Sequence, residues 1–139
     1  MKNDSFFVDT HLFLRYLTND NPKQADAVER LLRKAAEGKI KLVTNSLVFA
    51  ELIWTLENYY HLDRMDIQNK AIAILNTKGL EVMDGDMILK AIFWYGEKNV
   101  DFREAFNVAW MIKNDLNQAF TFDQTNFKRF EGIIVETPK

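Results

Sequence analysis

The chain has 139 residues, of which 47% are hydrophobic, so it is large enough to bury a sizeable core and we expect a single domain over residues 1–139. The absence of cysteine excludes disulfides and thiolate metal sites, and it favours a reducing, cytoplasmic location. A net charge of −2 argues against a generally basic nucleic-acid-binding protein, although a local basic rim would not show in the total. No apolar run approaches membrane-spanning length, so we expect neither a membrane segment nor a signal peptide.

Short apolar segments alternate with segments of helical periodicity along the whole chain. Strands are expected at residues 6–8, 40–43, 80–82, 119–122 and 133–135, and helices at residues 12–17, 22–37, 47–60, 67–75, 87–95 and 102–113. The expected helix boundaries include Asn21 before Pro22, Ser46 and Asp63 as N-terminal caps and Gly38 as a terminator. This alternation predicts an α/β fold, a three-layer α/β/α sandwich on a mostly parallel central sheet.

Two aspartates directly follow predicted strands, Asp9 after the first and Asp123 after the fourth. If those strands are parallel neighbours, both carboxylates emerge at one edge of the sheet and repel each other unless a proton or a cation intervenes. The pair therefore indicates a metal site. Since the chain has no cysteine and only two histidines, a hard cation on oxygen ligands, Mg²⁺ or Mn²⁺, is favoured over zinc.

A third acid, Glu51, lies in the apolar helical segment 47–54. An unpaired carboxylate would be costly to bury there, so some partner must meet it. A buried salt bridge or a bond to a backbone amide would explain the residue structurally. Metal ligation beside Asp9 is the functional alternative.

Two further acids, Asp101 and Glu104, open the helix expected at residues 102–113. Their spacing fits a capping box, in which Asp101 accepts from the amide of Glu104 and Glu104 reaches back. Glu104 can equally project from the first helical turn into the same cleft as the other acids. The spacing alone leaves both interpretations open.

Four segments, in this order, resemble the motifs of PIN-domain ribonucleases, and most closely the VapC-type toxins of toxin–antitoxin pairs: Val8-Asp9-Thr10, residues 50–54, residues 101–105 and Thr121-Phe122-Asp123. Residues 14–22 and 51–56 are also similar to stretches common in that branch. The resemblance implies an endoribonuclease that depends on Mg²⁺ or Mn²⁺, with Asp9, Glu51, Glu104 and Asp123 as catalytic metal ligands and Asp101 as an accessory ligand. It also implies a homodimer and a cognate antitoxin protein that binds a groove along the third and fourth helices.

Two positions depart from the family pattern. Glu104 stands where the family usually has aspartate, which leaves open whether Asp101 or Glu104 is the ligand, and His11 stands where asparagine is usual. The departures keep a second hypothesis open, a catalytically silent PIN-like module that binds RNA or protein. A phosphoaspartate protein is disfavoured because position 11 is not a second aspartate.

Several neighbouring side chains have both a functional and a structural interpretation. Thr10 can orient a water or a ligand, or cap a helix. His11 can bond a ligand or phosphate, or form a hydrogen bond at the start of the helix. Arg15, Lys98 and Arg103 are candidate RNA contacts or solvated surface charges.

Overall fold

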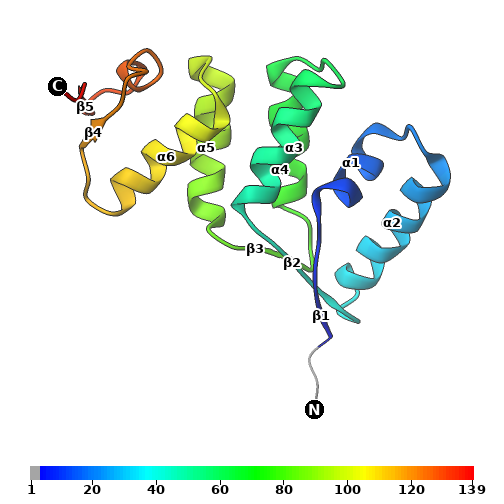
Figure 1. Cartoon of the computed structure of the whole chain (residues 1–139). Coiled ribbons are helices and arrows are strands. Elements are labelled where there is room, and N and C mark those ends of the chain that lie inside the picture. The colour runs from blue at the N-terminus through cyan, green and yellow to red at the C-terminus, as the bar shows by residue number, and fades with distance from the viewer. Residues whose placement is uncertain (1–3) are drawn as a thin grey trace. The chain divides into compact units, whose positions relative to one another are not determined.

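The computed structural model describes residues 4–139 and divides the chain into two compact units, Met1–Gly85 and Asp86–Lys139. The first unit contains β1 (Ser5–Phe7), α1 (Thr10–Thr18), α2 (Pro22–Ala36), β2 (Lys41–Thr44), α3 (Ser46–Asn58), α4 (Arg64–Leu75) and β3 (Leu80–Val82). The second contains α5 (Gly85–Lys98), which begins at the boundary, α6 (Phe102–Lys113), β4 (Gln118–Phe120), the 3₁₀ helix η1 (Phe127–Arg129) and β5 (Ile134–Glu136) (Figure 1).

The sheet of the first unit is parallel, with the strand order β1-β2-β3. Beyond the last paired residues, the amide of Val8 donates to the carbonyl of Val43 at 2.9 Å. The hydroxyl of Thr44, which is fully buried, donates to the carbonyl of Val8 at 3.0 Å. These two bonds fix the backbone of Val8, just beyond the carboxyl end of β1, and Asp9 directly follows Val8.

The helices of the first unit bury one face each. In this unit α1 packs against α2 and α3, and α3 packs against α4 (Figure 1). The largest side chains that the packing removes from water are apolar, and burying each stabilises the fold by roughly 1.5–3 kcal/mol. They include Phe13, Leu42, Phe49, Leu52, Leu56 and Ile67.

The second unit is built on α5 and α6, and its two strands form a parallel pair, β4-β5. Ile88 and Ile92 on α5 and Val108 on α6 are fully buried. Trp94 packs edge-on against Phe130, with the ring centroids 4.9 Å apart. This contact ties the segment after η1 to α5.

The α/β fold with parallel strands confirms the predicted class, and the order of helices and strands agrees with the prediction. Asn21, followed by Pro22, caps α2 as predicted, and Asp63 caps α4. The prediction for α3 was wrong, because Asn45 and not Ser46 is the cap and accepts from the amide of Val48 at 3.1 Å.

Strand pairing also qualifies the expectation for the two aspartates that follow strands. Within its own unit β1 pairs with β2, and β4 pairs with β5. The pairing of strands therefore does not itself place Asp9 beside Asp123.

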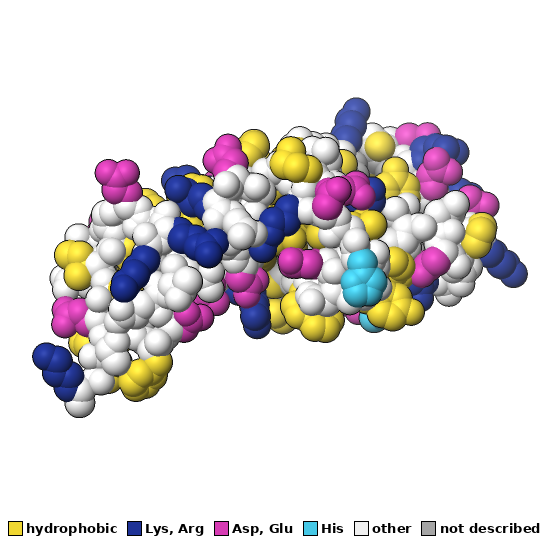
Figure 2. All heavy atoms as spheres, turned by 90° about the horizontal axis from the view of Figure 1, so that it is seen from above, with side chains coloured by type: hydrophobic (Ala, Val, Ile, Leu, Met, Phe, Trp, Pro, Cys, Tyr) yellow, Lys and Arg dark blue, Asp and Glu magenta, His cyan; other side chains and the backbone are white. Residues whose placement is uncertain are grey.

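Charged side chains of both signs are interspersed along the face drawn in Figure 2, in keeping with the small net charge. Over residues 4–139, no helix has the length and apolar character needed to cross a membrane.

Candidate metal-binding site

Asp9 and Glu51 are linked through Thr10, the first residue of α1. Asp9 is the N-terminal cap of α1, and its Oδ1 accepts from the amide of Thr10 at 2.7 Å. The hydroxyl of Thr10 donates to Oε1 of Glu51 on α3 at 2.5 Å. Thr10 itself is buried, so its side chain has little freedom to point elsewhere. A single buried threonine thus fixes the positions of two candidate ligands from different helices.

Glu51 is exposed, so the prediction that it is buried in an apolar face was wrong. It shares a stripe of α3 with Leu47 and Trp54, whose exposed fractions are 76% and 57%. Residues separated by four and then three positions lie on one side of a helix. The buried side carries Val48 and Leu52 instead, and neither a salt bridge nor a backbone amide meets Glu51 in the part of the chain described.

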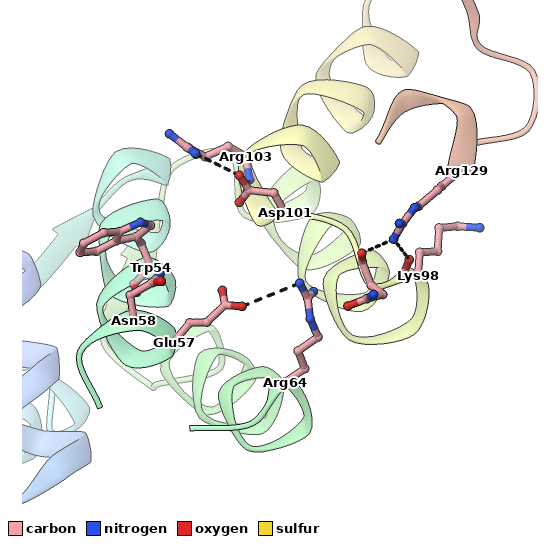
Figure 3. Close-up of polar contacts among 9 residues, drawn as sticks. Trp54, Glu57, Asn58, Arg64, Lys98, Asp101, Arg103 and Arg129 are labelled. Carbon is pink, nitrogen blue, oxygen red and sulfur yellow. Dashed lines mark hydrogen bonds and ion pairs between the residues drawn. The ribbon is translucent and has the colours of Figure 1, made fainter. Parts of the chain in front are cut away.

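The second group of acids lies at the start of α6. Asp101 caps this helix, but its Oδ1 accepts from the amide of Arg103 at 3.3 Å and not from that of Glu104. Oδ2 of Asp101 forms an ion pair with the Arg103 guanidinium at 3.0 Å (Figure 3). Within the described chain Glu104 does not reach back to the amide of Asp101 either, so neither hydrogen bond of the predicted capping box is present and that interpretation was wrong. The cap alone leaves Glu104 without a structural role.

Glu104 is half-buried in the first turn of α6. Burial raises the pKa of its carboxyl above the usual range, the negative charge of Asp101 raises it further, and the charge of Asp123 adds to the effect. The guanidinium of Arg103 acts in the opposite direction. Glu104 therefore sits where a negative charge is disfavoured unless positive charge is brought in.

Asp123 is exposed in the loop that follows β4, and two residues separate it from the end of the strand, so it does not follow the strand directly. Its amide donates to the hydroxyl of Thr121 at 3.0 Å, which fixes the turn. The carboxylate is close enough to Glu104 to raise the pKa of that residue. The second unit thus brings Asp101 and Asp123 close enough for their charges to act on the carboxyl of Glu104.

The candidate ligands fall into two sets, Asp9 with Glu51 and Asp101 with Glu104 and Asp123. Within either set of described residues, 4–85 or 86–139, no three His, Cys, Asp or Glu side chains converge closely enough to hold a metal ion. Among these five acids, Asp101 alone forms an ion pair within the described part of the chain. The other four carboxylates are not neutralised by a lysine or arginine there.

The donor set fits a hard cation. All five candidates are carboxylates, the ligands that Mg²⁺ and Mn²⁺ take in proteins, and one of them has a raised pKa that a cation would reverse.

The other candidate side chains have varied environments. His11 is exposed, and within the described chain it makes no hydrogen bond, so the structural alternative at the helix start is not supported. Arg15 is bonded to Gln24 and paired with Asp20, whereas Nζ of Lys98 lies over the ring of Phe130. Sequence reasoning missed Thr44, which fixes the end of β1. Its signal is a polar residue closing the apolar strand β2.

A family model for the PIN domain matches residues 6–133. The chain belongs to the PIN-domain family. The match covers most of the chain and includes all five candidate acids. It confirms the three-layer α/β/α fold class expected from the sequence.

Two solved structures are similar to this PIN domain at low identity. One is VapBC2 from Rickettsia felis bound to a DNA fragment from its promoter, with 16% identity over 97% of this chain and 99% of that chain and a TM-score of 0.38. The other is VapC20 of Mycobacterium tuberculosis, a toxin that cleaves the sarcin-ricin loop. Its identity is 19% over 88% of this chain and 93% of that chain, with a TM-score of 0.38. Neither adds weight to the assignment, which rests on the family match. No curated protein matches the chain.

Proposed function

We propose that this PIN domain is an endoribonuclease that depends on Mg²⁺ or Mn²⁺ and acts as the toxin of a toxin–antitoxin pair. The observation that carries the proposal is the family match over residues 6–133, which includes each acid of the candidate site. The VapC-type assignment is supported by the motif resemblance around Asp9, Glu51 and Asp123.

We propose that Asp9, Glu51, Glu104 and Asp123 hold the metal, with Asp101 as an accessory. Two features of the chain support this choice of residues. Thr10 holds Glu51 by a 2.5 Å hydrogen bond and leaves its second carboxylate oxygen available. Glu104 is half-buried with like charges around it and without an ion pair in the described chain, whereas Asp101 is already paired with Arg103.

The proposed chemistry is hydrolysis of an RNA phosphodiester bond. A bound Mg²⁺ or Mn²⁺ supplies an activated water and offsets the charge of the scissile phosphate. The protein's own carboxylates position the metal ion and do not transfer protons. Thr10 holds the two carboxylates of the first unit, and no histidine in the described chain is bonded to either. Ionised carboxylates alone would repel RNA, so the chain's acids are expected to bind substrate only together with the cation.

The proposed partners are a second copy of the chain and an antitoxin protein. The feature that supports a protein partner is the exposed apolar surface on the third and fourth helices. Leu47 and Trp54 on α3 and Met65 on α4 have exposed fractions of 76%, 57% and 57%. Exposed apolar patches of this kind are typical of sites for protein association.

The direct test is cleavage of structured RNA by the purified chain with Mg²⁺, after chelation by EDTA, and after Mg²⁺ is restored in excess. We expect cleavage, its loss and its recovery, because Mg²⁺ bound by a few carboxylates exchanges readily. Full activity in EDTA would contradict the metal-dependent mechanism. Binding of RNA without cleavage under any divalent metal would instead favour the silent binding module.

A further inference from the structure

A cavity of about 270 Å³ opens between α1, the helix that Asp9 caps, and α3, the helix that carries Glu51, entirely within the unit Met1–Gly85. Two residues that line the cavity lie close in the chain to Asp9 and Glu51. His11 follows Asp9 by two residues on α1, and Thr55 lies one helical turn after Glu51 and donates to its carbonyl at 2.8 Å. The polar and aromatic residues that line this space, the Tyr59 cavity, are His11, Arg15, Asp20, Thr55, Tyr59 and Tyr60.

One wall of the Tyr59 cavity is fixed by a hydrogen-bonded network. The carboxylate of Asp20 accepts from the hydroxyls of Tyr60 at 2.6 Å and Thr18 at 3.1 Å, and it lies 3.5 Å from Nη1 of Arg15. Nε of Arg15 donates to Gln24 at 2.7 Å. The bond from Tyr60, the largest effect, lowers the pKa of Asp20, so its carboxylate is ionised at neutral pH and forms an ion pair with Arg15. The wall is therefore organised before any ligand arrives.

The lining of the cavity also offers groups that are still available to a ligand. Tyr59 is 70% exposed and meets Tyr60 edge-on, with centroids 4.9 Å apart and planes at 79°. Arg15 has five N–H donors, and among residues 4–139 only those on Nε and Nη1 are near a partner. The free donors of Arg15 and the open ring of Tyr59 lie around the same small space.

These groups match a flat ring with acceptor atoms on its edge. Aromatic side chains stack on nucleobases, and arginine donors pair with the acceptor atoms of a base edge, most often O6 and N7 of guanine. The charges of Asp20 and Arg15 offset each other, so this pair supplies no net positive charge to attract a phosphate or an acidic peptide. The space is also suited to one ring system and not to a helix or an extended segment, which favours a base over a protein partner.

We propose that the Tyr59 cavity binds one nucleobase of the RNA strand next to the cleaved phosphate, with Tyr59 stacking on the base and Arg15 donating to its edge. This inference rests on the proposed function, because it assumes that Asp9 and Glu51 lie at the phosphate. The arginine contact makes guanine the expected base.

The test uses the full chain without divalent metal and compares the binding of the monophosphates GMP, AMP, CMP and UMP by calorimetry. All four carry the same phosphate, so a difference among them reports recognition of the base. We expect GMP to bind most tightly, and Arg15→Lys to reduce that preference because lysine lacks the planar fork. Equal affinities for all four nucleotides, or no binding, would overturn the proposal and leave the cavity to a protein segment.

Variants of the exposed tyrosine separate stacking from a general effect on the fold. Tyr59→Ala is expected to raise the Kd for GMP by about tenfold, the size expected for a lost stacking contact. Tyr59→Phe keeps the ring and should stay within about twofold of the unmodified chain. Tyr16→Ala is the matched control, since Tyr16 lies on α1 with 43% of its surface exposed and does not line the cavity. An unchanged Kd for Tyr59→Ala contradicts the proposal.

A second readout ties the cavity to cleavage. Sequencing the ends of a random RNA cut by the chain should show a guanine preference at one fixed position beside the cut, and Tyr59→Ala should weaken it. If the chain binds GMP through Tyr59 but cuts no RNA with any metal, the nuclease proposal fails while base recognition stands. If it cuts RNA with no base preference that Tyr59 controls, only the cavity proposal fails.

Discussion

The two units hold their acids in different ways. In Met1–Gly85, both Asp9 and Glu51 accept a hydrogen bond from Thr10, at 2.7 and 2.5 Å. In Asp86–Lys139, Glu104 accepts none from the described chain, and burial together with the charges of Asp101 and Asp123 raises its pKa. The first pair is positioned by donors, whereas the second group retains repulsion that a cation would relieve.

Two of the candidate acids, one from each unit, are also helix caps. Asp9 caps α1 and Asp101 caps α6, in each case through one carboxylate oxygen. The remaining oxygen differs between them. In Asp101 it is paired with Arg103, whereas no basic side chain within the described residues pairs with Asp9. The difference favours Asp9 as a ligand and Asp101 as an accessory.

The largest expected effect is that of Asp9→Asn, which should abolish RNA cleavage and leave the fold intact. Asparagine caps helices about as well as aspartate but lacks the charge that holds the metal. Cleavage of structured RNA and thermal unfolding measure the two effects. Asp63→Asn is the matched control, because Asp63 caps α4 and lies outside the proposed site. Cleavage at the normal rate by Asp9→Asn would rule out the site assignment.

Glu104→Gln tests the second group and should lower cleavage by at least about tenfold, equivalent to roughly 1.4 kcal/mol of transition-state stabilisation. The amide keeps the size of the side chain but is a poor ligand for Mg²⁺. Asp101→Asn, which retains the helix cap, should have the smaller effect on initial rates. Near-normal cleavage by Glu104→Gln together with an inactive Asp101→Asn would show that Asp101 is the ligand.

Thr10→Val removes the donor that positions Glu51 and should lower cleavage by about threefold to tenfold, or roughly 0.6–1.4 kcal/mol. Valine fills the same buried space, so the loss reports the hydroxyl and not a cavity. Cleavage rates at increasing Mg²⁺ measure it, with part of the loss recovered at high metal. Thr10→Ser, which retains the hydroxyl, is the control, and an equal loss in both variants would contradict a positioning role.

The smallest expected effect is on stability. The pKa of Glu104 in the folded chain is raised above the ordinary value of 4.5, so the folded state binds more protons than the unfolded state just above that pH. The wild-type chain therefore loses stability as pH rises through the folded pKa, whereas Glu104→Gln does not. Thermal unfolding in EDTA at about pH 4 and about pH 7 should show a relative gain for Glu104→Gln at the higher pH only.

Glu97→Gln is the matched control for this measurement, because Glu97 is an exposed carboxyl on α5 outside the cluster. A gain of the same size in both variants would mean that Glu104 is not specially destabilised by its neighbours.

Local chemistry made most of the fold predictable from the sequence. Asn21 and Asp63 were correctly identified as caps because their side chains bond to amides only three residues away. Asn45 and Ser46 are both good capping residues, and the sequence could not distinguish between neighbours with the same capability. Strand pairing was not predictable, because it depends on contacts between segments far apart in the chain.

Four candidate acids were found from their positions after strands and at a helix start, and Glu51 from its apolar sequence neighbours, but the surroundings of these acids were not predicted. Glu51 was expected to be buried because its sequence neighbours are apolar, yet Leu47 and Trp54 belong to the same exposed stripe. The helical periodicity of the segment indicates which residues share the exposed face. The Thr10–Glu51 bond joins residues 41 positions apart and has no local signal in the sequence.

The central proposal, that Asp9, Glu51, Glu104 and Asp123 hold a metal ion, is tested most directly by a crystal of the chain soaked in Mn²⁺. The account predicts an anomalous peak contacted by carboxylate oxygens of Asp9 and Glu51 and by those of Glu104 or Asp123. A peak held by the acids of one unit alone, or no peak at any of these carboxylates, would contradict it.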